Sequence, residues 1–379
     1  MITDQDRKIG LALSGGGIRA AIFHSGVLKK LAEKGLLEQV SFISTVSGAS
    51  LLMGLIYNFS DNKFPSSQDY LSKVLPKIEN LLTKENLQNE AVKNLFYREN
   101  WSDLLNRGNI LAKVLKSSWG VTGNLQDISD YPRWVINGTT RETGKCWRFS
   151  KERMGDYVTG YVVNPNIPIA DAISASAAYP PAIDHYKLQT SSYIWKHYRK
   201  GVEFKNSSQP TEPIIPDINF YHITDGGVYD NLATEAVFKN LGKELRDEID
   251  YLIVSDAGSS LDIKEVGPRF ISKMKRNFEI VLDQIISLRI RFIFNFFLDN
   301  PSSGVIVKIG RTAEQLIFEA KKIKKSNKVQ VNLDGFLSSN EARAVANYPT
   351  DLKKITTESF NLINRHGYET TEIQLKLYF

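Results

Sequence analysis

The sequence predicts an α/β protein in which buried strands alternate with amphipathic helices. Two observations lead to this fold class. Short apolar runs bounded by glycine or polar residues recur along the chain, and segments with apolar residues three and four positions apart follow the first of these runs. The chain has 379 residues, of which 42% are apolar and 24% are charged, a composition that is usual for a globular protein.

The N-terminal region is predicted to hold two strand–helix pairs. The segment "KIGLALS" (8–14) has the apolar and small residues of a buried strand, and the following segment (18–35) has helical spacing with Gly35 suited to a C-terminal cap. The segment "VSFISTV" (40–46) predicts a second strand, and "GASLLMGLIYNF" (48–59) predicts a second apolar helix.

The middle of the chain departs from this alternation and then returns to it. Two stretches resemble amphipathic helices inserted between core elements, at 67–96 and 101–117. Further strands are predicted at 133–138, 146–150, 218–224 and 250–258.

No internal repeat or low-complexity linker divides the chain, so a single domain over residues 1–379 is expected. Its core would cover about 8–260, with a helical insertion at about 60–130. The region from about 261 to 379 is more helical and more basic, and its position in the fold is not predicted.

Composition excludes several classes of site. A single cysteine, Cys146, excludes an intramolecular disulfide framework and a cysteine-based zinc cluster. The five histidines lack the spacing of metal ligands, so no metal and no cofactor is expected.

The charge pattern bears on partners and location. The polar start "MITDQDRKIG" lacks the apolar core of a signal peptide, and no membrane-spanning helix is predicted, so a cytoplasmic protein is expected. A net charge of +6 suits anionic partners, or is simply a basic surface. The lysine run "KKIKKSNK" (321–328) lacks aromatic residues, so no nucleic acid is expected as a partner.

One segment has the composition of a membrane-surface helix. Residues 269–297 mix arginine and lysine with large apolar side chains, as in amphipathic helices that lie on anionic bilayers. The same pattern is typical of a helix whose apolar face packs into a protein core, and both interpretations stay open.

Three consecutive glycines, Gly15, Gly16 and Gly17, lie where the first strand meets the first helix. Such a turn exposes backbone N–H groups beside the positive end of a helix dipole, which suits a phosphate, a dinucleotide or an oxyanion. The lysine of a Walker loop is missing. The dinucleotide pattern is met by Gly15, Gly17 and Ala20, but no carboxylate ends the second strand.

Ser47 lies between the second predicted strand and the second predicted helix, in "STVSGAS". A tight turn in this context lifts a serine hydroxyl clear of the backbone, as in a nucleophile elbow, and needs small residues two positions to either side. Ala49 meets this requirement, whereas Thr45 replaces the usual glycine. The alternative is a small-residue turn that packs a helix on a strand.

Asp225 follows a strand-like run and precedes two glycines in "FYHITDGGVYDN". Its carboxylate would lie in a turn at the end of a strand, where it could accept a proton from a serine hydroxyl. Asp256 in "VSDAGSS" also ends a predicted strand and is the rival base.

These motifs, in this order, resemble those of patatin-like phospholipases. The matching segments are "SGGGIRA", "STVSGAS" and "TDGGVYDN", together with "ASAAYPP" (175–181), and the resemblance covers roughly residues 8–260. It implies a three-layer α/β/α patatin-like core, and a Ser–Asp dyad that works without a catalytic histidine.

The resemblance also implies roles for individual residues. Ser47 would be the nucleophile and Asp225 the base, while the N–H groups of Gly15, Gly16 and Gly17 would form the oxyanion hole. Candidate supporting residues are Arg19, Gly48, Gly226 and Gly227. Thr45, Ala49 and Ala20 depart from the family pattern, and Arg19 could instead be a solvated side chain of the first helical turn.

The expected function is therefore a lipid acyl hydrolase that cleaves phospholipid or other lipid esters through an acyl-enzyme. An aspartate with the ordinary pKa of about 3.9 is a poor base at neutral pH, so partial burial is expected to raise the pKa of Asp225. Peripheral association with an anionic membrane would give access to the substrate.

Two alternatives remain at this stage. A Ser–His–Asp esterase could use His366, which follows the serine and the acid in the chain. A module that binds a nucleotide or a membrane, with an inactive elbow, would account for Thr45.

Overall fold

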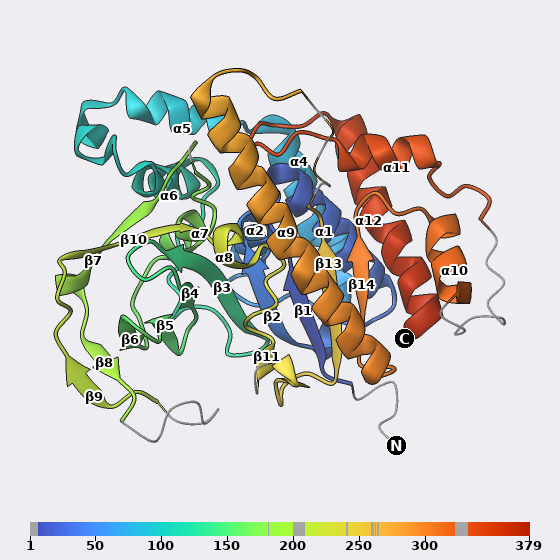
Figure 1. The fold of residues 1–379 in the computed structure, drawn as a ribbon, viewed down its shortest axis with the longest axis horizontal. Coiled ribbons are helices and arrows are strands. Elements are labelled where there is room, and N and C mark those ends of the chain that lie inside the picture. The colour runs from blue at the N-terminus through green and yellow to red at the C-terminus, as the bar shows by residue number, and fades with distance from the viewer. Residues whose placement is uncertain are drawn as a thin grey trace.

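The computed structural model describes residues 7–180, 182–199, 209–239, 242–258, 261, 263, 265–322 and 333–379. Most of the lysine run and Pro181 of the "ASAAYPP" segment lie outside the described residues. Figure 1 shows a central sheet with helices on both of its faces, which confirms the α/β class and the three-layer α/β/α arrangement.

One half of the main sheet is parallel and contains the strands nearest the N-terminus. Its order is β14–β13–β1–β2–β3, and every pairing in it is parallel. The bounds are β1 Ile9–Leu13, β2 Val40–Val46, β3 Arg133–Thr140, β13 Tyr251–Asp256 and β14 Gly304–Lys308.

The other half continues from β3 with antiparallel pairings through β4, β5, β6, β8 and β9, while β10 pairs with both β3 and β7. These strands are β4 Cys146–Phe149, β5 Arg153–Asp156, β6 Gly160–Val163, β7 Tyr186–Gln189, β8 Trp195–His197, β9 Glu212–Ile214 and β10 Phe220–Asp225. A separate hairpin pairs β11 Phe238–Lys239 with β12 Glu244–Leu245.

Helices connect and cover these strands. Those between β1 and β3 are α1 Gly17–Glu33, η1 Leu37–Gln39, α2 Gly48–Phe59, α3 Ser67–Asp69, η2 Tyr70–Val74, α4 Leu75–Lys84, α5 Leu87–Leu95, η3 Arg98–Asp103 and α6 Arg107–Ser118. Those after β6 are α7 Ile169–Ser176, η4 Thr190–Ser192, α8 Gly227–Asp230, α9 Phe270–Asp299, α10 Ala313–Lys322, α11 Ser339–Ala346 and α12 Thr357–Tyr378.

The predicted N-terminal elements agree closely with the structure. Strand β2 and helix α2 have the predicted bounds, and α1 ends at Glu33 with Gly35 in the left-handed region at φ 65°. The predicted helical insertion between α2 and β3 is also present. These segments were predictable because each carries an uninterrupted periodicity and ends at glycine or polar residues.

The alternation of side chains along the parallel strands separates two hydrophobic cores. In β13, Tyr251 and Ile253 belong to the larger core, while Leu252 and Val254 face the opposite side. Helices α1 and α2 lie over the larger core, and α9 crosses the other face, in front of the sheet in Figure 1. Strands buried on both faces are expected in a parallel sheet covered by helices.

The C-terminal region is part of this core. Strand β14 extends the parallel sheet, and α12 packs so closely on α1 that a Cβ at Gly26 would lie 1.9 Å from the carbonyl oxygen of Asn364. Glycine is therefore required at this helix crossing. No described helix is long and apolar enough to cross a bilayer.

The register of β3 brings two strand ends together. Val46, the last residue of β2, pairs with Asn137, and Asp225, the last residue of β10, pairs with the next residue, Gly138. Because β4 occupies the other edge of β3 at these positions, β2 and β10 lie on the same edge and meet end to end.

Candidate active site

Ser47 occupies a sharp turn between β2 and α2. Its backbone angles are φ 53° and ψ −116°, a region that L-residues rarely adopt outside strained turns. The Ser47 N–H donates to Ser176 Oγ at 3.0 Å. A Cβ at Gly48 would lie 2.1 Å from the carbonyl oxygen of Gly17, so only glycine fits after Ser47. This is the geometry of a nucleophile elbow.

Thr45, which departs from the family pattern, fits this elbow through its hydroxyl. Thr45 Oγ1 accepts hydrogen bonds from Ser50 Oγ at 2.9 Å and from Trp134 Nε1 at 3.0 Å. Both Thr45 and Ala49 are buried. A buried hydroxyl with two donors carries little desolvation cost, so threonine is compatible with the turn.

Asp225 lies in the turn between β10 and α8. Its Oδ1 accepts the N–H of Gly227 at 2.7 Å, and its own N–H donates to the carbonyl of Ala178 at 3.1 Å. A Cβ at Gly226 would lie 2.4 Å from the carbonyl oxygen of Asn137, so the backbone approaches β3 closely at this point. The two glycines therefore let the chain turn immediately after the carboxylate.

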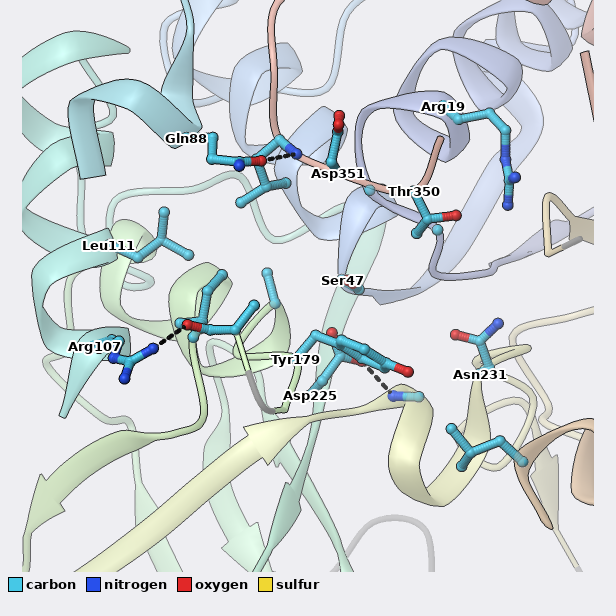
Figure 2. A pocket seen from close by; sticks show the side chains of 18 of the residues that line it. Arg19, Ser47, Gln88, Arg107, Leu111, Tyr179, Asp225, Asn231, Thr350 and Asp351 are labelled. Atoms are coloured by element: carbon cyan, nitrogen blue, oxygen red, sulfur yellow. Dashed lines mark hydrogen bonds between the residues drawn. The ribbon is translucent and has the colours of Figure 1, made fainter. Parts of the chain in front are cut away.

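The carboxylate of Asp225 is buried beside Ser47. Burial raises the pKa of Asp225 to about 6, against the opposite effects of the Gly227 N–H and the Ser47 hydroxyl. Asp225 Oδ2 accepts no hydrogen bond of ordinary geometry from any described residue. Figure 2 shows Ser47 and Asp225 close together, with Asn231 on one side and Arg107 of α6 on the other.

The glycine loop lies next to this pair. Gly16 and Gly17 have φ values of 143° and 60°, which favour glycine, and both line the same cavity as Ser47. Within the described part of the chain, neither of their N–H groups donates a hydrogen bond. Both groups are therefore available to a bound oxygen.

Gly15 differs from the expected oxyanion donor. Its N–H donates to the carbonyl of Asn231 at 3.0 Å and is therefore already engaged. A Cβ at Gly15 would lie 2.5 Å from Asn231 Oδ1 and 3.1 Å from Ser47 Cβ. Because its N–H already donates to Asn231, Gly15 does not fit the expected role of an oxyanion donor. The absence of a side chain at Gly15 instead lets the loop pass close to Ser47.

A cavity of about 720 Å³ opens over these residues. Its apolar wall comes mainly from α5, α6 and the segment after α7, and includes Leu95, Leu111 and Ile183. Helix α9 and the loop before α12 contribute the charged residues Arg276, Glu279, Asp283 and Asp351. A cavity of this size, apolar with a few polar groups, suits a small-molecule substrate.

A sequence model of patatin-like phospholipases matches residues 11–238, more than half of the chain. The chain belongs to the patatin-like phospholipase family. The match covers the glycine loop, the serine elbow and the aspartate turn, and ends within the short strand β11.

The solved structures that match this chain are distant in sequence. Human GIVD cytosolic phospholipase A2 has 12% identity and a TM-score of 0.52, with 98% of this chain and 59% of that chain covered. Its complex with methyl gamma-linolenyl fluorophosphonate has 14% identity and a TM-score of 0.49, over 98% and 58%. VipD from Legionella pneumophila has 13% identity and a TM-score of 0.36, over 98% and 67%.

The similarity to the human GIVD phospholipase A2 structure with a TM-score of 0.52 concerns the fold alone. The chain spans about 59% of the length of the human GIVD phospholipase A2 structure.

Arg19, which follows the family's glycine loop, is buried rather than solvated. Its Nη1 donates to the carbonyls of Ala346 and Tyr348, each at 2.8 Å, and its Nη2 donates to the carbonyl of Ala257 at 2.9 Å. The solvated interpretation is therefore wrong, because only 2% of this residue is exposed. Arg19 ties the start of α1 to two distant loops.

The rival base and the alternative histidine lie outside the cavity lining. Asp256 pairs with Lys308 at 3.1 Å and accepts the N–H of Gly258 at 2.9 Å. His366 Nε2 accepts the N–H of Gly310 at 2.8 Å, and burial lowers the pKa of His366 to about 4. A histidine held neutral in this way has its acceptor nitrogen already in use.

Three residues near the site were not identified from the sequence. Ser176 accepts the Ser47 N–H through its side chain and the Gly226 N–H through its carbonyl. Asn231 contacts the glycine loop, and its position six residues after Asp225 within "TDGGVYDN" is the one local signal. The backbone carbonyl of Asp351 accepts the Ile18 N–H at 3.0 Å, and Asp351 lies in a region that carries no motif.

Proposed function

We propose that this protein hydrolyses carboxylic esters of lipids through an acyl-enzyme on Ser47, with Asp225 as the general base. One observation carries the proposal: β2 and β10 end at neighbouring residues on one edge of β3, where a strained serine turn meets a buried carboxylate. The family supports the reaction class, and the cavity supports a substrate with an apolar chain.

In the first half-reaction, Ser47 Oγ attacks the ester carbonyl carbon while its proton passes to Asp225 Oδ2. With its pKa raised to about 6, Asp225 is mostly ionised at pH 7 and yet basic enough to accept the proton. The carbon–oxygen bond to the alcohol then breaks, and Asp225 returns the proton to the departing alcohol oxygen. Ser47 is left as an ester of the fatty acid.

In the second half-reaction, water attacks the acyl-enzyme. Asp225 takes one proton from the water and returns it to Ser47 Oγ as the fatty acid leaves. The oxyanion formed in each half-reaction would accept the N–H groups of Gly16 and Gly17. Elsewhere the loss of one such donor costs about 100- to 1,000-fold in turnover.

The apolar wall supports an acyl chain as the bound part of the substrate. Leu95, Ile110 and Leu111 present side chains from α5 and α6 to the cavity that contains Ser47. Burial of an acyl chain there would remove apolar surface from water, which favours binding. We infer a phospholipid, a lysophospholipid or another fatty-acid ester as substrate.

Labelling with a fluorophosphonate tests the nucleophile, and a lipid-class screen tests the substrate. The proposal expects one adduct, located on Ser47 by peptide mass spectrometry, and release of fatty acid that is lost in Ser47→Ala. Asp225→Asn should lose activity, whereas the matched variant Asp256→Asn should keep it if it folds. Full activity in both Ser47→Ala and Asp225→Asn would contradict the dyad.

A further inference from the structure

Exposed apolar side chains gather on two segments beside the cavity, and together they are called the rim. On the segment from α5 to α6, Leu105 is 83% exposed, Phe96 79% and Trp101 62%. At the start of α9, Ile271 is 79% exposed and Phe270 75%. The rim consists of Phe96, Trp101, Leu105, Phe270, Ile271 and Met274.

Both segments of the rim border the same opening. Leu95 of α5 lines the cavity that contains Ser47, and so do Arg276 and Leu282 of α9. Figure 1 shows the N-terminal end of α9 beside α5 at the upper edge of the molecule. Apolar side chains that flank an active-site cavity mark an interaction surface rather than scattered surface residues.

Helix α9 has apolar side chains on two different faces. Ile286, Ile290 and Ile293 belong to the core on that side of the sheet, and Ile293 is the one residue of the helix that is fully buried. Phe270 and Met274 lie one turn apart on the opposite side and are exposed. Phe270 and Met274 are therefore not part of the face through which α9 packs on the sheet.

The charge of α9 favours one kind of occupant. Residues 269–278 carry four basic side chains and no carboxylate. Arg276 pairs with Glu279 at 3.4 Å and lines the cavity, while Arg269, Lys273 and Lys275 are exposed beside the apolar residues. Aromatic and aliphatic side chains next to exposed cations match the interface of an anionic bilayer.

We propose that the rim docks on an anionic bilayer, so that the opening of the cavity faces the lipid. The inference rests on the proposed function, because docking would let a lipid ester pass from the bilayer into the cavity without crossing water. It does not depend on that function for its test, since docking needs no catalysis.

Vesicle sedimentation tests the docking. Protein carrying Ser47→Ala, which leaves lipids intact, is mixed with vesicles of phosphatidylcholine alone or of phosphatidylcholine with phosphatidylglycerol. Binding to the anionic vesicles, weakened by added salt, is expected. Two double variants should each lower the partition coefficient about tenfold or more. One combines Phe96→Ser with Trp101→Ser, and the other combines Phe270→Ser with Met274→Ser. The pair Lys273→Gln with Lys275→Gln should lower it for anionic vesicles alone.

Matched controls come from exposed apolar residues away from the cavity. Ile194 is 77% exposed before β8 and Phe318 is 59% exposed on α10, and neither lines the cavity. Ile194→Ser and Phe318→Ser should bind vesicles as the parent does. With Ser47 intact, each rim pair should hydrolyse p-nitrophenyl butyrate within about twofold of wild type, which shows that it is folded.

Three results would overturn the docking surface. They are unchanged vesicle binding in both rim pairs, an equal loss in the controls, or equal binding to neutral and anionic vesicles. A dimer that the rim pairs convert to monomer, with vesicle binding unchanged, would identify an interface between copies instead. If the wild type hydrolyses no ester, the proposed function is wrong. Vesicle binding then still tests whether the rim docks on a bilayer.

Discussion

Ser47 follows the last residue of β2, and Asp225 is the last residue of β10; the two lie side by side because both strands end on one edge of β3. One strand runs parallel to β3 and the other antiparallel, so their C-terminal ends point at each other. The proposed nucleophile and the proposed base come from distant parts of the chain, and one shared neighbouring strand, β3, positions both.

The strained backbone at Ser47 predicts that glycine is more stable than alanine at this position. Ser47→Gly should be more stable than Ser47→Ala by about 1 kcal/mol, because glycine adopts φ 53° without the steric cost that a Cβ imposes. Both variants should lose nearly all esterase activity. Urea unfolding of the two variants measures the difference, and equal stabilities would contradict strain at this turn.

The raised pKa of Asp225 predicts the pH profile of the reaction. A general base must be ionised, so kcat/KM for a soluble ester should rise with pH through about 6 and then level off. The acidic limb should have the slope of one proton. Stopped assays between pH 4 and 9 measure it; a limb centred near pH 4 would show that Asp225 titrates as an exposed carboxylate.

The same pKa predicts a stability effect with a defined sign. The pKa of Asp225 is about 6 in the folded protein and near 3.8 when unfolded, so the folded state binds more protons between these values. Its stability therefore falls as pH rises through that window, and the penalty is complete above it. Asp225→Asn should raise the free energy of unfolding by about 3 kcal/mol at pH 8 and by little at pH 4. Asp256→Asn, which breaks an ion pair, should instead destabilise at pH 8.

The contact between Gly15 and Asn231 predicts energetic coupling. A Cβ at Gly15 would lie 2.5 Å from Asn231 Oδ1, so Gly15→Ala should displace the glycine loop and lower kcat about tenfold or more. Asn231→Gly in the same protein removes that clash and should restore part of the activity. A double-mutant cycle on kcat measures the coupling, expected at about 0.5–3 kcal/mol. Strictly additive effects would contradict a direct contact.

The predictability of the molecule varied along the chain. From β1 to α2 the elements were predictable almost to the residue, because each has an uninterrupted periodicity and a glycine or polar boundary. Strand β14 was not predicted, since its five residues lie in a region dominated by helix. The two interpretations of 269–297 differed only in what covers the helix, which periodicity cannot tell.

Some features of the candidate site were predictable from the sequence and others were not. The glycine loop, the serine turn and the aspartate turn were each visible in the sequence, because unusual backbone angles and close approaches demand glycine locally. The engaged N–H of Gly15 and the carbonyl acceptors of Arg19 were not visible. Both depend on residues more than two hundred positions away in the chain.

The sequence by itself determined the strand–helix alternation, the three turns and the family resemblance, all of which depend on residues close in the chain. Only the tertiary structure decided that Asp225 rather than Asp256 lies beside Ser47, and that α9 and Asp351 border the cavity. The physical reason is that local patterns specify backbone conformation. The register of distant strands and the packing of helices specify which side chains meet, and no local pattern records them.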